Sequence, residues 1–279
     1  MRTGSLKPCL FQCIVSALLL FVHGAVRGDL AIETETARLV APGHVDVGAA
    51  FEFQTSAAGQ EYALPAALEF GILPRLEALI EPVPFTSIRP TGGEHATGVG
   101  DLETTLTALA IDERRFIPAV ALAGEVKFPT ARNRQIGSGE YDYRIYGILS
   151  KRFGNLDAHF NLGYNFIGSP PGVSTSNPVD VEAGAEWFVN RRCDLFVEFN
   201  YIGSAAGSSG GGEGGGAAAM RAVALSHAKS ALTSEIAGEE MVGSAGVRFH
   251  LSRHVDIFSS FSYDKLDDKL LRTGITVKY

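Results

Sequence analysis

The sequence predicts an all-β protein: a single closed antiparallel transmembrane β-barrel of about 12 strands, preceded by an N-terminal signal peptide that is removed. Three observations predict it. The chain starts with an apolar leader, the rest alternates apolar and polar residues with a period of two, and the links between alternating segments are long at one end and short at the other. Alternation indicates strands because successive side chains of a strand point to opposite faces.

Residues 1–28 have the layout of a secretory signal peptide. Arg2 and Lys7 precede the apolar run from Cys9 to Val22, and small residues follow this run. The run is too short to be predicted as a spanning helix, with an uncleaved anchor as the alternative. We therefore expect residues 29–279 to form the mature barrel domain. Two of the three cysteines leave with the leader, so no disulfide is expected within the mature chain.

Twelve segments of the mature chain alternate, each of about ten residues, the length that a tilted membrane strand needs. The clearest are 45–54, 156–166 and 179–187, where one face is apolar and the other polar. Pro82 and Pro84 predict a bulged or frayed strand, because proline cannot donate to the ladder. The remaining segments are 62–70, 75–85, 99–111, 120–128, 141–149, 195–201, 241–251, 255–263 and 271–279.

The links favour a membrane barrel over a soluble sandwich, which would also bury one face of each strand. Outer-membrane barrels have short periplasmic turns and longer outer loops. Short turns are predicted near residues 75, 112–115, 152–155, 190–192 and 252–254. The longer links are predicted at 86–98, 129–139, 168–178 and 203–240.

Aromatic residues at both ends of the apolar faces support the same interpretation, because barrels carry aromatic girdles at both interfaces. The outer set is Tyr62, Tyr141, Tyr143, Tyr164, Phe166, Tyr201 and Tyr263, and the inner set is Phe70, Phe116, Trp187, Phe249 and Tyr279. The chain ends on Tyr279, and a terminal aromatic resembles the signal that the barrel-assembly machinery reads. An even strand count lets the first and last strands close the edge.

Three short motifs resemble the MetA-pathway of phenol degradation family of outer-membrane barrels. They are Thr97-Gly98-Val99-Gly100-Asp101-Leu102, Glu125-Val126-Lys127-Phe128-Pro129-Thr130 and Leu162-Gly163-Tyr164-Asn165-Phe166-Ile167-Gly168. The resemblance spans most of the mature chain and implies an outer-membrane channel or transporter for small solutes, hydrophobic or aromatic ones among them. Ala131, where a glycine is expected, and the glycine-rich stretch after Gly203 depart from the family pattern and leave a shared substrate open.

If the apolar faces meet lipid, the polar faces line the lumen, and acids outnumber bases there. A ring of carboxylates favours cations, so cationic or neutral solutes are the hypothesis, while pairing of these charges across strands in a filled barrel is the alternative. The predicted channel-lining residues are Glu69, Glu125, Lys127, Asp142, Arg144, Asp157, Glu186, Glu198 and Arg248. Glu52, Glu103, Asp180, Glu182 and Arg272 share the same polar face.

The segment 204–240 is glycine-rich and then rich in helix formers, so it predicts either a surface excursion or a plug that folds into the lumen. The expected partners are outer-membrane lipid, the barrel-assembly machinery and a small-molecule solute. The chain carries a formal net charge of -7 without a basic stripe, so nucleic acid is not expected. No cofactor or metal is expected.

Two other functions stay open: a barrel enzyme acting on lipid, and a structural or adhesive barrel without transport. An enzyme would need a Ser, His and Asp or Asn set near one end of the barrel. Neither Ser226-His227 nor His159 has an evident oriented nucleophile, and His250, Arg253 and His254 lack a metal-ligand pattern with acids. The chain is therefore not expected to be an enzyme.

Overall fold

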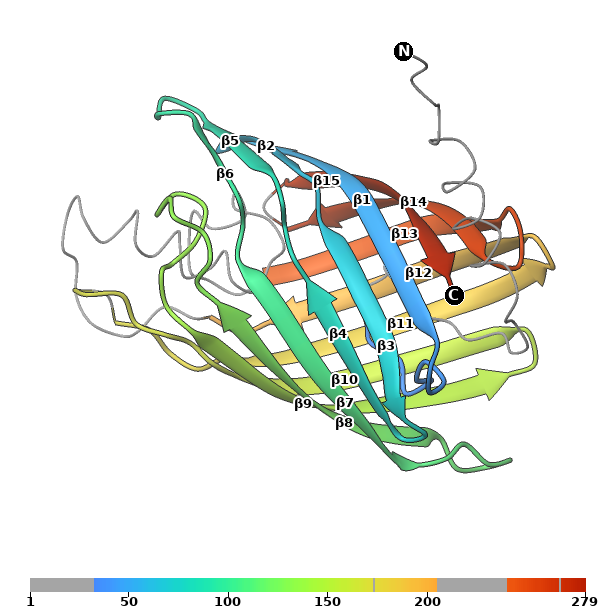
Figure 1. The fold of residues 1–279 in the computed structure, drawn as a ribbon. Helices are drawn as coiled ribbons and strands as arrows, with labels where there is room; N and C mark the ends of the chain where they lie inside the picture. The colour runs from blue at the N-terminus through green and yellow to red at the C-terminus, as the bar shows by residue number, and fades with distance from the viewer. Residues whose placement is uncertain (1–32, 173, 205–239, 266) are drawn as a thin grey trace, which may run out of the picture.

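A computed structural model describes residues 33–172, 174–204, 240–265 and 267–279, and in this part of the chain every regular element is a strand. The strands form one antiparallel sheet that closes into a barrel (Figure 1). They are β1 (Val45–Ser56), β2 (Gly59–Ala63), β3 (Ala66–Leu73), β4 (Leu76–Glu81), β5 (Thr86–Pro90), β6 (Ala96–Gly98), β7 (Leu102–Ile111), β8 (Ala119–Phe128), β9 (Asp142–Phe153), β10 (Leu156–Phe166), β11 (Val179–Asn190), β12 (Cys193–Ile202), β13 (Glu240–His250), β14 (Val255–Asp264) and β15 (Lys269–Lys278). The described residues contain no helix that could cross a membrane.

These fifteen elements make twelve transmembrane strands, because three strands are interrupted. β2 continues into β3, β4 into β5 and β6 into β7, with breaks at residues 64–65, 82–85 and 99–101. The break between β4 and β5 contains Pro82 and Pro84, which confirms the disturbance predicted there. The breaks lie side by side: the Ala66 amide donates to the Pro82 carbonyl, and the Gly100 amide donates to the Val83 carbonyl.

β1 and β15 close the barrel. Their register runs from Asp46 opposite Lys278 to Thr55 opposite Lys269, and the Tyr279 amide adds a bond of 2.8 Å to the Val45 carbonyl. Closure leaves the sheet without a free edge, which satisfies the backbone inside a bilayer. The predicted fold class, strand number and pairing of the first and last strands are confirmed.

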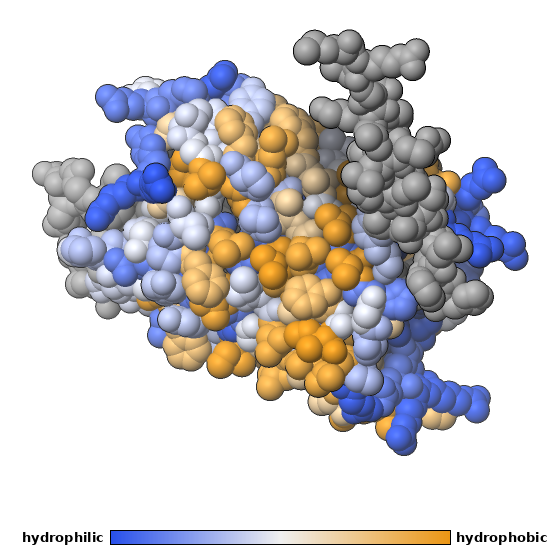
Figure 2. All heavy atoms as spheres, in the orientation of Figure 1, coloured by the Kyte–Doolittle hydropathy of each residue, from blue (hydrophilic) through white to orange (hydrophobic). Residues whose placement is uncertain are grey.

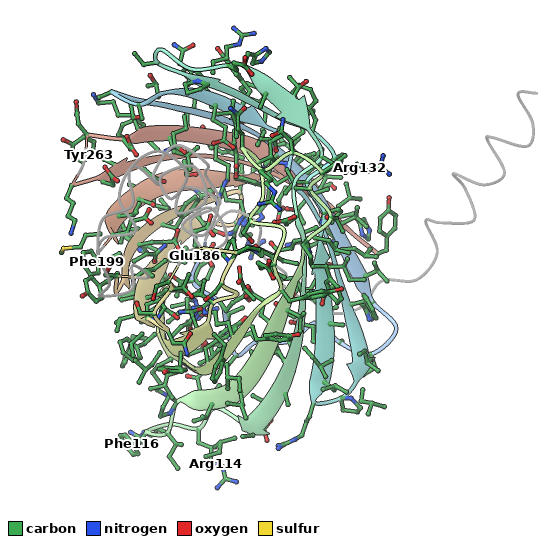
Figure 3. All side chains as sticks on the ribbon, turned by 90° about the vertical axis from the view of Figure 1, so that its left-hand side faces the viewer. Arg114, Phe116, Arg132, Glu186, Phe199 and Tyr263 are labelled. Carbon is green, nitrogen blue, oxygen red and sulfur yellow. The ribbon has the colours of Figure 1, made fainter. Side chains whose placement is uncertain are left out.

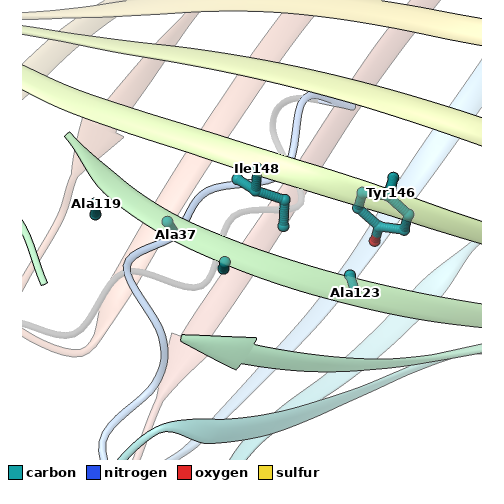
Figure 4. Close-up of a cluster of buried hydrophobic side chains, with 6 residues drawn as sticks. Ala37, Ala119, Ala123, Tyr146 and Ile148 are labelled. Carbon is teal, nitrogen blue, oxygen red and sulfur yellow. The ribbon is translucent and has the colours of Figure 1, made fainter. Parts of the chain in front are cut away.

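The two faces of the barrel differ as the alternation predicts. Large apolar side chains are exposed on the outside and form a band across the strands (Figure 2), while polar side chains are buried inside. A small apolar cluster also lies on the inner wall, where Tyr146 and Ile148 meet the alanines of β8 (Figure 4). Phe116, predicted at the inner end of a strand, lies instead in the β7–β8 turn and is 83% exposed.

The links are unequal, although one was predicted wrongly. Residues 86–98 are not a long loop: they form the β5–β6 hairpin, whose link is 91–95, because Ser87 and Ile88 pair with Thr97 and Ala96. The links 129–141 and 167–178 are long, and the opposite end of the barrel has turns of two to seven residues, such as 154–155 and 112–118. The signal peptide and most of segment 204–240, including its plug hypothesis, lie outside the described residues.

Candidate channel lumen

All nine predicted channel-lining residues lie on the polar, inward face of the barrel. Glu69, Glu125 and Arg144 are partly buried. Glu186 points into the interior in Figure 3, whereas Phe199 and Tyr263 point outward. That these side chains line an open path stays a prediction. The other six are buried: Lys127, Asp142, Asp157, Glu186, Glu198 and Arg248.

Arg144 on β9 is the centre of an ion network on the β8–β11 wall. Its Nε lies 3.2 Å from Asp180 Oδ1 and its Nη2 lies 2.6 Å from Glu182 Oε1, both on β11. Glu125 is more distant, at 3.9 Å. The guanidinium also stacks on the Tyr146 ring at 4.1 Å from its centroid.

A glycine explains how Arg144 reaches across a whole strand. Gly163 on β10 pairs with Asp180, and a Cβ at residue 163 would lie 2.3 Å from Asp180 Oδ1. The missing side chain lets the Asp180 carboxylate fold over β10 toward β9. Sequence alternation alone cannot predict this contact, because it depends on the register of three strands.

Other inward cations are paired in the same way. Arg248 contacts Glu186, Arg272 lies 2.5 Å from Glu52 Oε1, and Lys127 contacts Asp142. The alternative that charges pair across strands is therefore part of the observed geometry. Acids still predominate, because the buried residues of the described chain include fourteen Asp or Glu against three Lys or Arg.

Residues 33–42 form an N-terminal strap that lies against the inner wall, a feature that sequence reasoning missed. The Thr34 amide donates to Glu198 Oε1 at 2.7 Å on β12, and the Ala37 amide donates to Ser150 Oγ at 2.8 Å on β9. Val40 donates to a Glu77 oxygen on β4. The strap therefore crosses the interior from one wall to the opposite one.

Besides Glu33, which contacts Arg272 on β15, Arg38 is a charged anchor of the strap. Its Nε and Nη2 lie 2.7 and 2.8 Å from the two Asp157 oxygens, and its Nη2 lies 2.6 Å from Glu113 Oε2. Lys151 and Arg152 complete the cluster at 3.0 and 2.7 Å from Glu113 and Asp157. Partial burial raises the pKa of Glu113, but hydrogen bonds from Arg38 and Lys151 outweigh it and hold this pKa below its usual range.

Two inward glycines make room for the strap. A Cβ at residue 71 would lie 2.3 Å from the Val40 carbonyl oxygen, and a Cβ at residue 184 would lie 3.0 Å from Thr34 Oγ1. Pro42 also forms an isolated bridge with Gly71. Glycines at inward strand positions were the available sequence signal, because such positions otherwise carry side chains that fill the barrel.

The outer end carries a second inward-folded segment, residues 129–141. Its Ile136 is buried with Ala58, Ile88 and Ala96 of the outer hairpins. In the same segment, Ser138 Oγ accepts a hydrogen bond of 3.0 Å from Lys127 Nζ on β8. These contacts hold the segment against the barrel instead of leaving it extended in solvent.

The residues considered for an enzyme or a metal site are engaged structurally. His159 Nδ1 lies 2.9 Å from Ser150 Oγ, a partner that the sequence did not suggest, but this serine is fully buried and holds the strap. His250 lies between Asp194 and Asp256, at 2.6 and 2.7 Å, two neighbours that the sequence did not indicate. Among the described residues, no group of three or more His, Cys, Asp or Glu side chains is arranged so that it could hold a metal ion, and Ser226-His227 lies outside these residues.

Comparison with known proteins places this barrel in a family. A family model, described as "Putative MetA-pathway of phenol degradation", matches residues 23–227. The chain belongs to this family. No curated protein sequence matches the chain.

Solved structures of similar fold have little sequence identity to this member of the MetA-pathway family. The COG4313 outer membrane channel from Pseudomonas putida F1 is 9% identical with a TM-score of 0.65, covering 91% of this chain and 100% of that one. The NanC porin is 10% identical with a TM-score of 0.56, covering 83% and 98%. The KdgM porin, solved in complex with disordered oligogalacturonate, is 8% identical with a TM-score of 0.51, covering 83% and 98%. At these identities the likeness establishes the outer-membrane barrel fold.

Proposed function

We propose that this protein is an outer-membrane channel that lets small solutes cross, with a preference for cationic or neutral solutes. The observation that carries the proposal is a closed barrel whose buried interior is polar and strongly acidic. A barrel that only anchored other structures in the membrane would not require so many carboxylates inside, because each costs desolvation free energy. The fold shared with the COG4313 channel and two porins supports the proposal.

The preference for cations follows from the charges that remain after pairing. Each inward arginine has at least one carboxylate partner, and Arg144 alone has three within 4 Å. The interior therefore carries a surplus of acid along the path, and rings of carboxylate attract cations and repel anions. The family description supports aromatic solutes as the candidate cargo, with neutral phenolic compounds first among them.

The N-terminal strap narrows the proposed path. It contacts β9, β10 and β12 on one wall and β3 and β4 on the other. A solute must then pass between the strap and the wall, or the strap must move. The proposed channel is thus narrow, and small solutes are favoured over large ones.

Planar-bilayer recording tests the channel and its selectivity together. In a KCl gradient the reversal potential should show K⁺ permeating several times better than Cl⁻. Glu125→Gln should reduce this preference, because Glu125 is partly exposed to the lumen. At 3.9 Å it is the most distant of the three carboxylate partners of Arg144, which keeps the other two when the charge of Glu125 is removed. Glu94→Gln, at an exposed residue of the β5–β6 link, is the matched control and should behave as wild type. Absence of conductance would contradict the channel, and anion selectivity would contradict the cation preference.

Uptake by cells tests the solute class. Cells that make the protein should accumulate neutral aromatic solutes and small organic cations faster than cells that lack it, whereas organic anions should show little difference. Equal uptake of all three classes with and without the protein would argue against transport.

A further inference from the structure

The turns at the inner end of the barrel carry exposed arginines. Arg114 and Arg115 lie in the β7–β8 turn, Arg191 and Arg192 in the β11–β12 turn, and Arg253 in the β13–β14 turn. We call these five residues the inner arginine set. They contrast with a chain whose formal net charge is -7. Figure 3 shows Arg114 at the end of its turn, extending away from the barrel.

These five arginines differ from the other cations at the same end. Lys151 and Arg152 turn toward Glu113 and Asp157, Lys278 lies 2.7 Å from Asp256, and Arg75 contacts Asp112. Among the described residues, none of the five has a carboxylate within ion-pair distance. They therefore do not serve the internal network, and their guanidinium groups face the surroundings of the barrel.

Apolar side chains accompany the arginines. Phe116 is 83% exposed beside Arg115, whose guanidinium lies 5.1 Å from the ring centroid. Trp187 and Leu251, near the other two turns, are 54% and 63% exposed. Aromatic side chains prefer the boundary between hydrocarbon and headgroups, so these residues place the arginines at headgroup level.

The chemistry that such a set fits is phosphate. Guanidinium groups bind phosphate oxygens with two parallel hydrogen bonds, which lysine cannot do. The five residues lie on three turns spread around the barrel, next to the lipid-facing band. This distribution matches lipids arranged around a barrel better than one protein docked on a single face.

We propose that the inner arginine set binds the phosphate headgroups of anionic phospholipids in the periplasmic leaflet. The lipid lies with its acyl chains along the apolar band and its phosphate on a guanidinium. Phe116 and Trp187 hold the turns at the depth where this contact forms. The site is separate from the lumen and does not depend on the channel function.

Native mass spectrometry of the mature, folded protein in mixed micelles tests this proposal, with equal amounts of phosphatidylglycerol and phosphatidylcholine as probes. The amount of phosphatidylglycerol bound to wild type should exceed the amount of phosphatidylcholine by about fivefold. This is the ratio that one arginine near an anionic lipid surface is expected to give. The double variants R114Q/R115Q and R191Q/R192Q should each lower this ratio, and the quadruple variant should bring it close to one.

R132Q/R134Q is the matched control, because Arg132 and Arg134 are exposed arginines of the outer link 129–141. It should keep the wild-type ratio. The gel mobility of the unheated barrel checks folding, and the two double variants keep the proposal testable even if the quadruple variant fails to fold. An unchanged ratio in both double variants would overturn the proposal and leave an acidic protein as the occupant of these turns. An equal loss in the control would overturn it too.

Discussion

The two sides of the barrel are built differently and hold the strap differently. From β8 to β15 the strands are uninterrupted, and the strap is held there by side chains, through Ser150, Asp157 and Glu198. From β2 to β7 each strand is broken, and the strap is held by a close backbone approach at Gly71 and by Glu77. The β8–β15 side thus supplies the carboxylate that pairs with Arg38, whereas the β2–β7 side supplies the Glu77 hydrogen bond and the closest backbone approach, at Gly71. This difference shows how each contact can be broken separately.

Gly71→Ala should have the largest effect, because it acts on backbone. The new Cβ would lie 2.3 and 2.4 Å from the carbonyl oxygens of Val40 and Ala41, and neither can rotate away. The strand is held by the ladders to β1 and β4, so the strap moves instead. Single-channel conductance should rise severalfold, and the unfolding free energy should fall by about 1–3 kcal/mol, as for other overpacked sites.

Gly147→Ala is the control for this variant. Residue 147 is also a strand glycine, but a Cβ there has nothing within 4 Å. Conductance and stability should stay at wild-type values. If Gly71→Ala also leaves conductance unchanged while the barrel stays folded, the strap does not limit the path.

The same two sides differ in how well their structure could be predicted from the sequence. Strong alternation in 156–166 and 179–187 predicted β10 and β11 closely, because an uninterrupted strand between lipid and lumen needs a strict period of two. On the other side, Pro82 and Pro84 predicted one break. The breaks at 64–65 and 99–101 were not predicted, although Pro65 in the first of them was an available signal, because proline cannot donate to the ladder.

The candidate lumen was predictable by residue but not by contact. Alternation identified Arg144 and Glu186 as inward residues. Alternation could not predict the ion pairs of Arg144 with Asp180 and Glu182. These pairs reach across β10 and require the missing side chain of Gly163. The strap was missed because its residues have no regular period, and its contacts lie more than 100 positions away at Ser150, Asp157 and Glu198.

Arg38→Met tests the charged side and should raise the single-channel conductance less than Gly71→Ala does, because the contacts at Gly71 and Glu77 stay in place. It removes the guanidinium but keeps the length of the side chain, and Arg152 still satisfies one Asp157 oxygen. Docking of the strap should weaken by about 1–3 kcal/mol, the cost of leaving a buried polar group unsatisfied. Hydrogen exchange at the amides of Ala37 and Val40 should accelerate, whereas exchange in β12 should not change.

Arg89→Met is the matched control for this exchange experiment. Arg89 stacks over Tyr62 at the outer end, 5.6 Å from the ring centroid, and it does not contact the strap. Exchange at Ala37 should match wild type in this variant. Faster exchange at Ala37 in Arg89→Met would mean that the loss of an arginine elsewhere also loosens the strap. The proposed specific role of Arg38 would then be rejected.

Acid should produce the smallest change, through Glu113 at the inner end of the charged side. Its pKa is lowered in the folded protein from 4.5, because the hydrogen bonds of Arg38 and Lys151 outweigh its partial burial. A group with a depressed pKa contributes stability above its unfolded pKa and loses it as pH falls through the folded value. The contribution of Glu113 to holding the strap is therefore complete above its unfolded pKa of 4.5 and is lost as the pH falls through its lower folded value.

Conductance recorded from pH 7 downward tests this step. The wild type should gain conductance once the pH falls below 4.5, and Glu113→Gln should show a higher conductance at pH 7 with a smaller gain on acidification. Asp267→Asn is the control, because a hydrogen bond from Lys269 lowers the pKa of Asp267, which lies in the outer β14–β15 turn and does not belong to the Arg38 cluster. If Glu113→Gln shows the full acid response of wild type, the response arises from the lumenal carboxylates and not from Glu113. The strap would then be held mainly by the close fit at Gly71.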